Sequence, residues 1–186
     1  MSAIARAFVA VVPPADVLDA VEDAAGPLRL REPALRFVGR EQWHVTLQFL
    51  GRVPDDLALS DALGSALTTV APFDVRLGGV GAFPSVARAA VLWIGVAEGS
   101  ESFGRLAAAV CDASASLGFA AEDRPFHAHL TVARAGRPRR VAETVTAFGV
   151  EPLGPRWTVD SVALVASDTR RDGAVYTEVA RFPLSG

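Results

Sequence analysis

The chain has 186 residues, of which 51% are hydrophobic and 21% are charged, and its formal net charge at pH 7 is −3. This composition excludes a disordered tail, a collagen-like repeat and a small disulfide scaffold. A chain of this length can bury an ordinary core, so we expect a single domain over residues 1–186. No strong overall charge attracts it to nucleic acid or to an anionic membrane, and an RNA or phosphate ligand would therefore need a local site.

Hydrophobic periodicity and turn residues predict alternating strands and helices. In chain order, the predicted elements are a strand over 4–12, a helix over 15–25 that ends at Gly26-Pro27, strands over 35–38 and 43–50, a helix over 55–70, strands over 73–80 and 88–97, a helix over 101–117, a strand over 127–133, a helix over 138–148, and strands over 156–166 and 174–182. The residues between the last two strands indicate a hairpin or a longer loop. This mixture favours an α+β fold over a parallel βαβ array.

Several chemistries are excluded by missing residue types. All 18 basic residues are arginine, which excludes lysine nucleophiles and the Walker phosphate loop. Cys111 is the only cysteine, which excludes an intramolecular disulfide and a multi-cysteine zinc site. The apolar run Ala7–Val12 is too short to span a membrane and is followed by Pro13-Pro14, so it is interpreted as a first strand and not as a signal peptide. We expect a cytoplasmic monomer that does not bind membranes.

Two segments nearly half the chain apart share one pattern. His44–Gly51 (HVTLQFLG) and His129–Gly136 (HLTVARAG) both read His, apolar, Thr, apolar, two variable positions, apolar, Gly. Side chains of a strand alternate between its faces, so each histidine shares a face with the threonine two residues later. A duplicated lobe would produce this echo. Each copy would then present one imidazole and one hydroxyl on a polar face backed by core.

Two such faces opposed across a cleft would suit phosphoryl transfer on a phosphodiester. One imidazole would take a proton from the attacking oxygen, and the other would give a proton to the leaving oxygen, since the ordinary pKa of histidine lies near neutral pH. The hydroxyls of Thr46 and Thr131 would donate hydrogen bonds to the phosphate oxygens. His44 and His129 are therefore the predicted catalytic residues, and the scheme requires neither a metal nor a cofactor.

Neighbouring residues leave alternatives open. His127 and His129 share a strand face and could chelate a metal with a nearby carboxylate, but no further ligand cluster is visible in the sequence. If His129 is catalytic, His127 is placed to contact the substrate or to orient its neighbours. Arg134 would fit a phosphate, although strict alternation turns it away from His129 unless the strand ends or bulges near Ala135-Gly136.

We expect different environments for two phenylalanines near the motifs. Phe49 occupies the position of Arg134 in the first copy, and we expect it in the core. Phe126 precedes the second motif in a loop, where exposure and substrate contact are more plausible than for Phe49.

The paired motifs resemble the signature of the 2H phosphoesterase superfamily. The segments Ala7–Pro14, Trp43–Gly51, GAFPS (Gly81–Ser85), Arg124–Arg134 and Asp172–Leu184 are similar, in this order, to the bacterial and archaeal RNA 2′,3′-cyclic phosphodiesterases, formerly called 2′-5′ RNA ligases. The resemblance covers essentially the whole chain. It implies a bilobal α+β fold with two lobes related by a pseudo-twofold axis, each with an antiparallel sheet and outer helices, and an active-site cleft between them.

The resemblance also implies an activity: opening of a 2′,3′-cyclic phosphate at an RNA end to a 2′-phosphate without metal or cofactor, with weak 2′-5′ ligation. His44 would be the acid toward the 3′ oxygen and His129 the base that activates water, or the reverse. Thr46, Thr131 and Arg134 would hold the phosphate. This chain departs from the family at Ala128, where members often have proline, which changes backbone freedom but removes no functional group.

Three other functions remain as hypotheses at this point. The first is a phosphodiesterase that acts on small nucleotide-derived cyclic phosphates in place of RNA ends. The second is a non-catalytic module that binds RNA ends through Arg134 and the arginines of segment 137–140. The third is a metal hydrolase that uses His127 and His129.

Overall fold

The protein was analysed as a computed structural model that describes residues 3–120, 123–170 and 173–186. The α-helices within these ranges are α1 (Ala15–Arg31), α2 (Asp56–Leu67), α3 (Ser100–Ala115) and α4 (Ala142–Phe148), and a short 3₁₀ helix η1 covers Arg40–Gln42. The strands are β1 (Ile4–Val11), β2 (Arg36–Phe37), β3 (Val45–Val53), β4 (Phe73–Phe83), β5 (Ala89–Glu98), β6 (His129–Arg139), β7 (Pro152–Val159), β8 (Ser161–Arg170) and β9 (Gly173–Pro183). No helix within the described ranges is long and apolar enough to cross a membrane.

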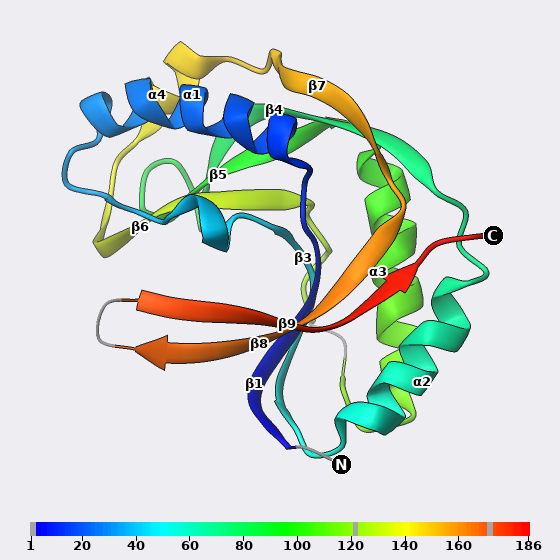
Figure 1. Ribbon diagram of the computed structural model, residues 1–186. Coiled ribbons are helices and arrows are strands. Elements are labelled where there is room, and N and C mark those ends of the chain that lie inside the picture. Colours follow the sequence, from blue (N-terminus) through cyan, green and yellow to red (C-terminus); the bar gives the residue numbers. More distant parts are fainter. Residues whose placement is uncertain (1–2, 121–122, 171–172) are drawn as a thin grey trace.

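All nine strands belong to one antiparallel sheet, whose order is β7-β4-β5-β6-β3-β1-β8-β9, with β2 paired to β6. The order has an internal symmetry, because β6 and β3 meet in the middle and three further strands follow on either side. Figure 1 shows the two halves of the sheet diverging from this junction. The predicted α+β class and the antiparallel pairing implied by the family resemblance are thus confirmed, but the strands form one continuous sheet and not one sheet in each lobe.

Each half of the sheet carries its own pair of helices. Helix α1 contacts β7 and α4 contacts β4, whereas α3 contacts β3 and α2 contacts β9 (Figure 1). Buried side chains of the helices and of the covered sheet face form one large apolar cluster. A second, smaller cluster lies on the other face of β1 and β8 and contains Phe8, Ala10, Ala163 and Val165. This second face also carries the candidate site.

Helix α1 is longer than the sequence predicted. It passes through Gly26-Pro27 and ends at Arg31. The apolar face continues beyond the proline to Leu28, which is fully buried, and this burial holds the last turn against the core. A proline removes one backbone hydrogen bond, so tertiary packing here outweighs a local stop signal.

Three other predicted boundaries were wrong. The single strand predicted over 156–166 is two strands that separate at Asp160: β7 pairs with β4, and β8 pairs with β1. Strand β6 continues to Arg139, so the helix predicted from 138 begins only at Ala142. Hydrophobic periodicity could not show these changes, because the extra strand residues gain order from their neighbours in the sheet and not from their own apolar pattern.

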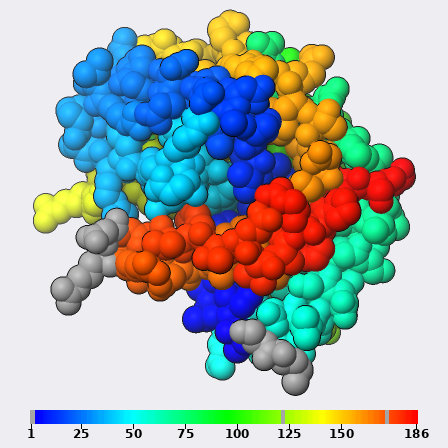
Figure 2. All heavy atoms as spheres, viewed as in Figure 1, coloured from blue at the N-terminus to red at the C-terminus, as the bar shows by residue number. Residues whose placement is uncertain are grey.

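Of the hairpin or longer loop expected near the C-terminus, the structure has the hairpin: β8 and β9 pair from Ser161↔Pro183 to Arg170↔Gly173, with one register shift between Leu164 and Val165. Figure 2 shows this hairpin, in orange and red, crossing the molecule below α1 and below the cyan segment that leads into β3. Its residues 171 and 172 lie outside the described part of the chain. The hairpin brings Tyr176 to the sheet face on which the first motif lies.

Candidate functional site

The two His-x-Thr motifs meet where the halves of the sheet join. Strands β3 and β6 are antiparallel with Val45 opposite Leu130, and both side chains are fully buried. The same register places His44 opposite Thr131 and Thr46 opposite His129. Since side chains alternate along each strand, all four groups lie on the face opposite the buried valine and leucine. The motifs thus come together by direct strand pairing.

Both imidazoles are held in the same way by their own backbone. The Nδ1–H of His44 donates to the carbonyl oxygen of Gln42 at 2.7 Å, and the Nδ1–H of His129 donates to the carbonyl oxygen of His127 at 2.7 Å. A carbonyl oxygen only accepts hydrogen bonds, so Nδ1 carries the proton in each ring. In the neutral form this leaves the Nε2 lone pair of both rings available as a base.

Aromatic side chains support both histidines. The His44 ring stacks on Phe8 with centroids 4.5 Å apart and meets the edge of Tyr176 at 5.4 Å. The His129 ring meets Phe83 edge-on at 4.9 Å and lies 6.1 Å from Trp93. Sequence reasoning assigned no role to these four aromatic residues. Phe8, Phe83 and Tyr176 do lie in segments that resemble the family, whereas Trp93 lies in none of them.

Gly81 in the GAFPS segment allows the Trp93 ring to pack close to the strand that carries Phe83. A Cβ atom added to Gly81 would lie 2.1 Å from the Trp93 ring, so only glycine leaves room for the indole. Trp93 in turn contacts the His127 ring at 4.8 Å. Gly81 therefore helps to place Trp93 and Phe83 beside His127 and His129.

Arg134 reaches the site because β6 contains a bulge. Leu92 pairs with Ala133 and Trp93 pairs with Thr131, which leaves Val132 as an extra residue. Consequently Val132 and Ala133 are both buried, and Arg134 returns to the face of His129. The irregularity expected at Ala135-Gly136 is present as a second register shift, between the pairs Ala89↔Arg139 and Val91↔Arg134, but the bulge that redirects Arg134 lies earlier in the strand.

The matching bulge in β3 overturns the expectation for Phe49. Val9 pairs with Gln48 and Ala10 pairs with Thr46, so Leu47 is the extra residue. Phe49 consequently lies on the open face with 49% of its surface exposed, and not in the core as predicted. Both bulges occur three residues after the motif histidine, and both bring the side chain five residues after it back to the site.

His127 and Phe126 lie at the edge of the site. Both are exposed, and the His127 ring lies 6.2 Å from that of His129. Within the described ranges, no three His, Cys, Asp or Glu side chains gather closely enough to hold a metal ion. The histidine pair therefore has no third protein ligand there.

The chain was compared with known proteins and structures. A family model of the 2′-5′ RNA ligase superfamily matches residues 13–171. The chain belongs to the 2′-5′ RNA ligase superfamily. A relative from Thermus thermophilus, named RNA 2′,3′-cyclic phosphodiesterase, is 37% identical over 193 residues, which cover 97% of this chain and 91% of the relative. A relative of the same name from Archaeoglobus fulgidus is 35% identical over 182 residues, with 95% and 99% covered.

Coverage differs among the superfamily members. The chain spans only 57% of the length of the relative from Geobacillus stearothermophilus. Two solved structures match nearly end to end. One from Thermus thermophilus has a TM-score of 0.80 at 34% identity and covers 97% of this chain and 98% of that one. Escherichia coli LigT complexed with 3′-AMP has a TM-score of 0.78 at 26% identity, with 98% and 99% covered.

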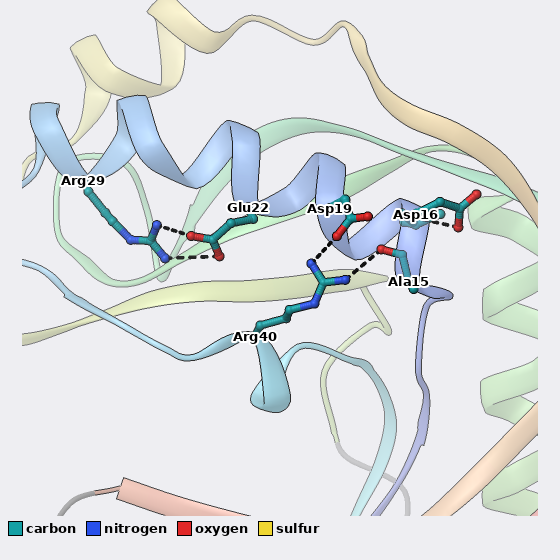
Figure 3. Close-up of polar contacts among 7 residues, drawn as sticks. Ala15, Asp16, Asp19, Glu22, Arg29 and Arg40 are labelled. Atoms are coloured by element: carbon teal, nitrogen blue, oxygen red, sulfur yellow. Dashed lines mark hydrogen bonds and ion pairs between the residues drawn. The ribbon is translucent and has the colours of Figure 1, made fainter.

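In this superfamily member, the segment before His44 is anchored on two sides. The Arg40 guanidinium pairs with Asp19 at 2.7 Å and donates to the carbonyl oxygen of Ala15 at 2.8 Å, which ties η1 to the first turns of α1 (Figure 3). The Gln42 amide donates to the carbonyl oxygen of Ala174 at 2.6 Å, which ties the same segment to β9. Since the Gln42 carbonyl accepts from His44, these anchors fix the ring orientation.

The electrostatic environment keeps both imidazoles neutral. Burial lowers the pKa of His44 to about 4, and the hydrogen bond to Gln42 opposes this effect. Repulsion from Arg134, and from His129 when that ring is protonated, acts in the same direction as burial. Burial also lowers the pKa of His129, with contributions of the same sign from His127, Arg124 and Arg134. Arg134 thus lowers the pKa of both histidines.

Two cavities flank the motifs of this superfamily member. One of about 470 Å³ is lined by His44, Phe8, Tyr176 and residues of η1. The other, of about 420 Å³, is lined by His129, Thr46, Phe49 and Phe126 together with α3. Each histidine therefore borders an open volume.

The lowered pKa of His44 predicts an acid-sensitive fold. The unfolded chain binds a proton at its ordinary pKa of 6.5, whereas the folded protein does so only near 4. The stability is complete above pH 6.5 and falls by about 3 kcal/mol as the pH decreases to about 4. Urea unfolding between pH 7 and pH 4 measures this effect. We expect His44→Gln to lose correspondingly less stability over the same range, and parallel curves for the two proteins would contradict the prediction.

Proposed function

We propose that the protein hydrolyses RNA 2′,3′-cyclic phosphate ends to 2′-phosphates by metal-independent acid–base catalysis with His44 and His129. The observation that carries this proposal is the shared sheet face on which two imidazoles, each with a free Nε2, alternate with two threonine hydroxyls. The relatives that match nearly the whole chain bear the name of this activity. The site lies in a cleft between two lobes, one built on each half of the sheet.

The reaction needs one proton acceptor and one proton donor. The Nε2 atom of neutral His129 takes a proton from water as its oxygen attacks phosphorus. The bond between phosphorus and the 3′ oxygen then breaks, and protonated His44 gives its Nε2 proton to that oxygen. The products are a 2′-phosphate and a 3′-hydroxyl. Since the motifs are symmetric, the reverse assignment performs the same reaction. A 5′-hydroxyl that attacked in place of water, with the same 3′ oxygen leaving, would give weak 2′-5′ joining.

Substrate binding favours the protonated form that the catalytic acid needs. In the free protein, burial and neighbouring positive charges lower the pKa of both histidines. A bound phosphate anion opposes the positive charge of Arg134 and favours the protonated form of an adjacent imidazole. Substrate binding therefore brings the acid into its working form at the moment it is needed.

The remaining site residues hold the phosphate and its nucleoside. The hydroxyls of Thr46 and Thr131 donate to the non-bridging oxygens, whose charge increases in the transition state. Arg134 contributes a planar guanidinium on the same face. His127 and Phe126, at the edge of the second cavity, contact the terminal nucleoside.

The deciding experiment uses an oligonucleotide that ends in a 2′,3′-cyclic phosphate. Phosphorus NMR of the product separates a 2′-phosphate from a 3′-phosphate. We expect only the 2′-phosphate, with a rate unchanged by EDTA. Formation of the 3′-phosphate, loss of turnover with EDTA, or tight binding of the end without any product would each contradict the proposal.

A further inference from the structure

A second positive charge lies beside Arg134, and the proposed reaction does not use it. Strand β2 pairs with β6 so that Arg36 stands directly opposite Arg134 and Phe37 opposite Ala133. Directly opposed residues of an antiparallel pair point to the same side of the sheet, with Cβ atoms about 5 Å apart. Arg36 therefore shares the face that Arg134 shares with His129.

Neither guanidinium is neutralised by the protein. Within the described ranges, the side chains of Arg36 and Arg134 have no hydrogen bond or ion pair, and both residues are exposed. Some other arginines of the sheet do pair with a carboxylate, as Arg156 does with Glu98. The stretch 124–142 contains five arginines and no Asp or Glu. Like charges directly opposite each other destabilise a sheet, so the pair contributes nothing to the fold unless an anion binds between or beside them.

We propose that Arg36 binds the phosphodiester that precedes the terminal nucleotide, so that the enzyme favours RNA ends over cyclic mononucleotides. This inference rests on the proposed function. A 2′,3′-cyclic phosphate closes the 3′ end of a strand, so the nearest other anion in the substrate is the phosphate on the 5′ oxygen of the same ribose. With the cyclic phosphate between the motif histidines near Arg134, that second phosphate meets the neighbouring guanidinium. The planar fork of arginine suits two phosphate oxygens.

Two substrates that differ in a single phosphate test the inference. One is adenosine 2′,3′-cyclic phosphate with a 5′-hydroxyl, and the other is the same nucleotide with a 5′-phosphate. We expect the wild-type kcat/KM to be about tenfold higher for the 5′-phosphorylated substrate at low ionic strength, as for a charge-assisted hydrogen bond. Arg36→Ala should lower this ratio to near one, and Arg36→Lys should keep part of it, because the charge remains without the fork.

Matched measurements make the outcome unambiguous. Arg52→Ala removes an exposed arginine at the far end of β3 and should leave the ratio at its wild-type value. The advantage of the 5′-phosphate should decrease with salt, with a slope of about 0.7 in a double logarithmic plot, which Arg36→Ala abolishes. A wild-type ratio near one, or a ratio unchanged in both Arg36 variants, would overturn the inference. Absence of turnover of either substrate by the wild-type protein would instead overturn the proposed function.

Discussion

Replacing His129 with alanine is expected to lower kcat by roughly 10²–10⁴, the contribution of a positioned general acid or base. The variant loses the Nε2 atom that accepts the proton of water and keeps both threonines and Arg134. His44→Ala should have an effect of similar size from the other side of the phosphate. The loss of kcat in the double variant should be far smaller than the product of the two single losses, because the two imidazoles act on one transition state. Single-turnover hydrolysis of an oligonucleotide with a cyclic end measures all three.

The third histidine provides the matched comparison. His127 is exposed and contacts Trp93 and Phe83 by its ring, and we assign it to substrate contact and not to proton transfer. His127→Ala should therefore act mainly on KM. A kcat within a factor of a few of wild type for His129→Ala, or equal kcat losses for His127→Ala and His129→Ala, would contradict the assignment of the catalytic pair.

Thr46→Val and Thr131→Val are each expected to lower kcat by roughly 10²–10³, as for the loss of one preorganised donor to a developing oxyanion. Valine keeps the branched shape and the strand preference of threonine but cannot donate a hydrogen bond. Both threonines are only partly buried, so the substitution should leave the folded state intact. The loss should appear in kcat, because the phosphate oxygens gain charge on the way to the transition state.

Serine at the same positions separates chemistry from packing. Thr46→Ser and Thr131→Ser retain the hydroxyl and should recover most of the activity that the valine variants lose. Thermal unfolding of all four variants checks that the sheet is preserved. If the valine variants retained wild-type kcat while the serine variants did not, the hydroxyls would not be the phosphate donors.

The two motifs were visible in the sequence, whereas most of the residues around them were not. The echo of His44-x-Thr46 in His129-x-Thr131 was visible because two short, similar patterns suffice to show it, and the strand interpretation gave the shared face of each pair. The sequence could not show that Val45 and Leu130 pair directly, since strand pairing between distant segments leaves no local pattern.

Bulges decide which side chains reach the site, and one of them overturned the prediction for Phe49. Simple alternation directs Phe49 into the core and Arg134 away from His129, and one extra residue in each strand reverses both outcomes. A bulge depends on how neighbouring strands register, which the residues of one strand do not encode on their own. The aromatic supports were missed for the same reason, because Phe8, Tyr176 and Trp93 belong to strands far from the motifs in sequence.

The paired bulges have a consequence for the stereochemistry of the reaction. A rotation of 180° would exchange the two His-x-Thr motifs. The four motif groups alone could therefore bind an asymmetric substrate in either of two opposite orientations. The bulge in β6 brings the Arg134 cation to the site, and the bulge in β3 brings the phenyl ring of Phe49. Under the proposed function, a ribose cyclic phosphate, charged at one end and carrying a flat base at the other, would bind in a single orientation, and each imidazole would then have a distinct role.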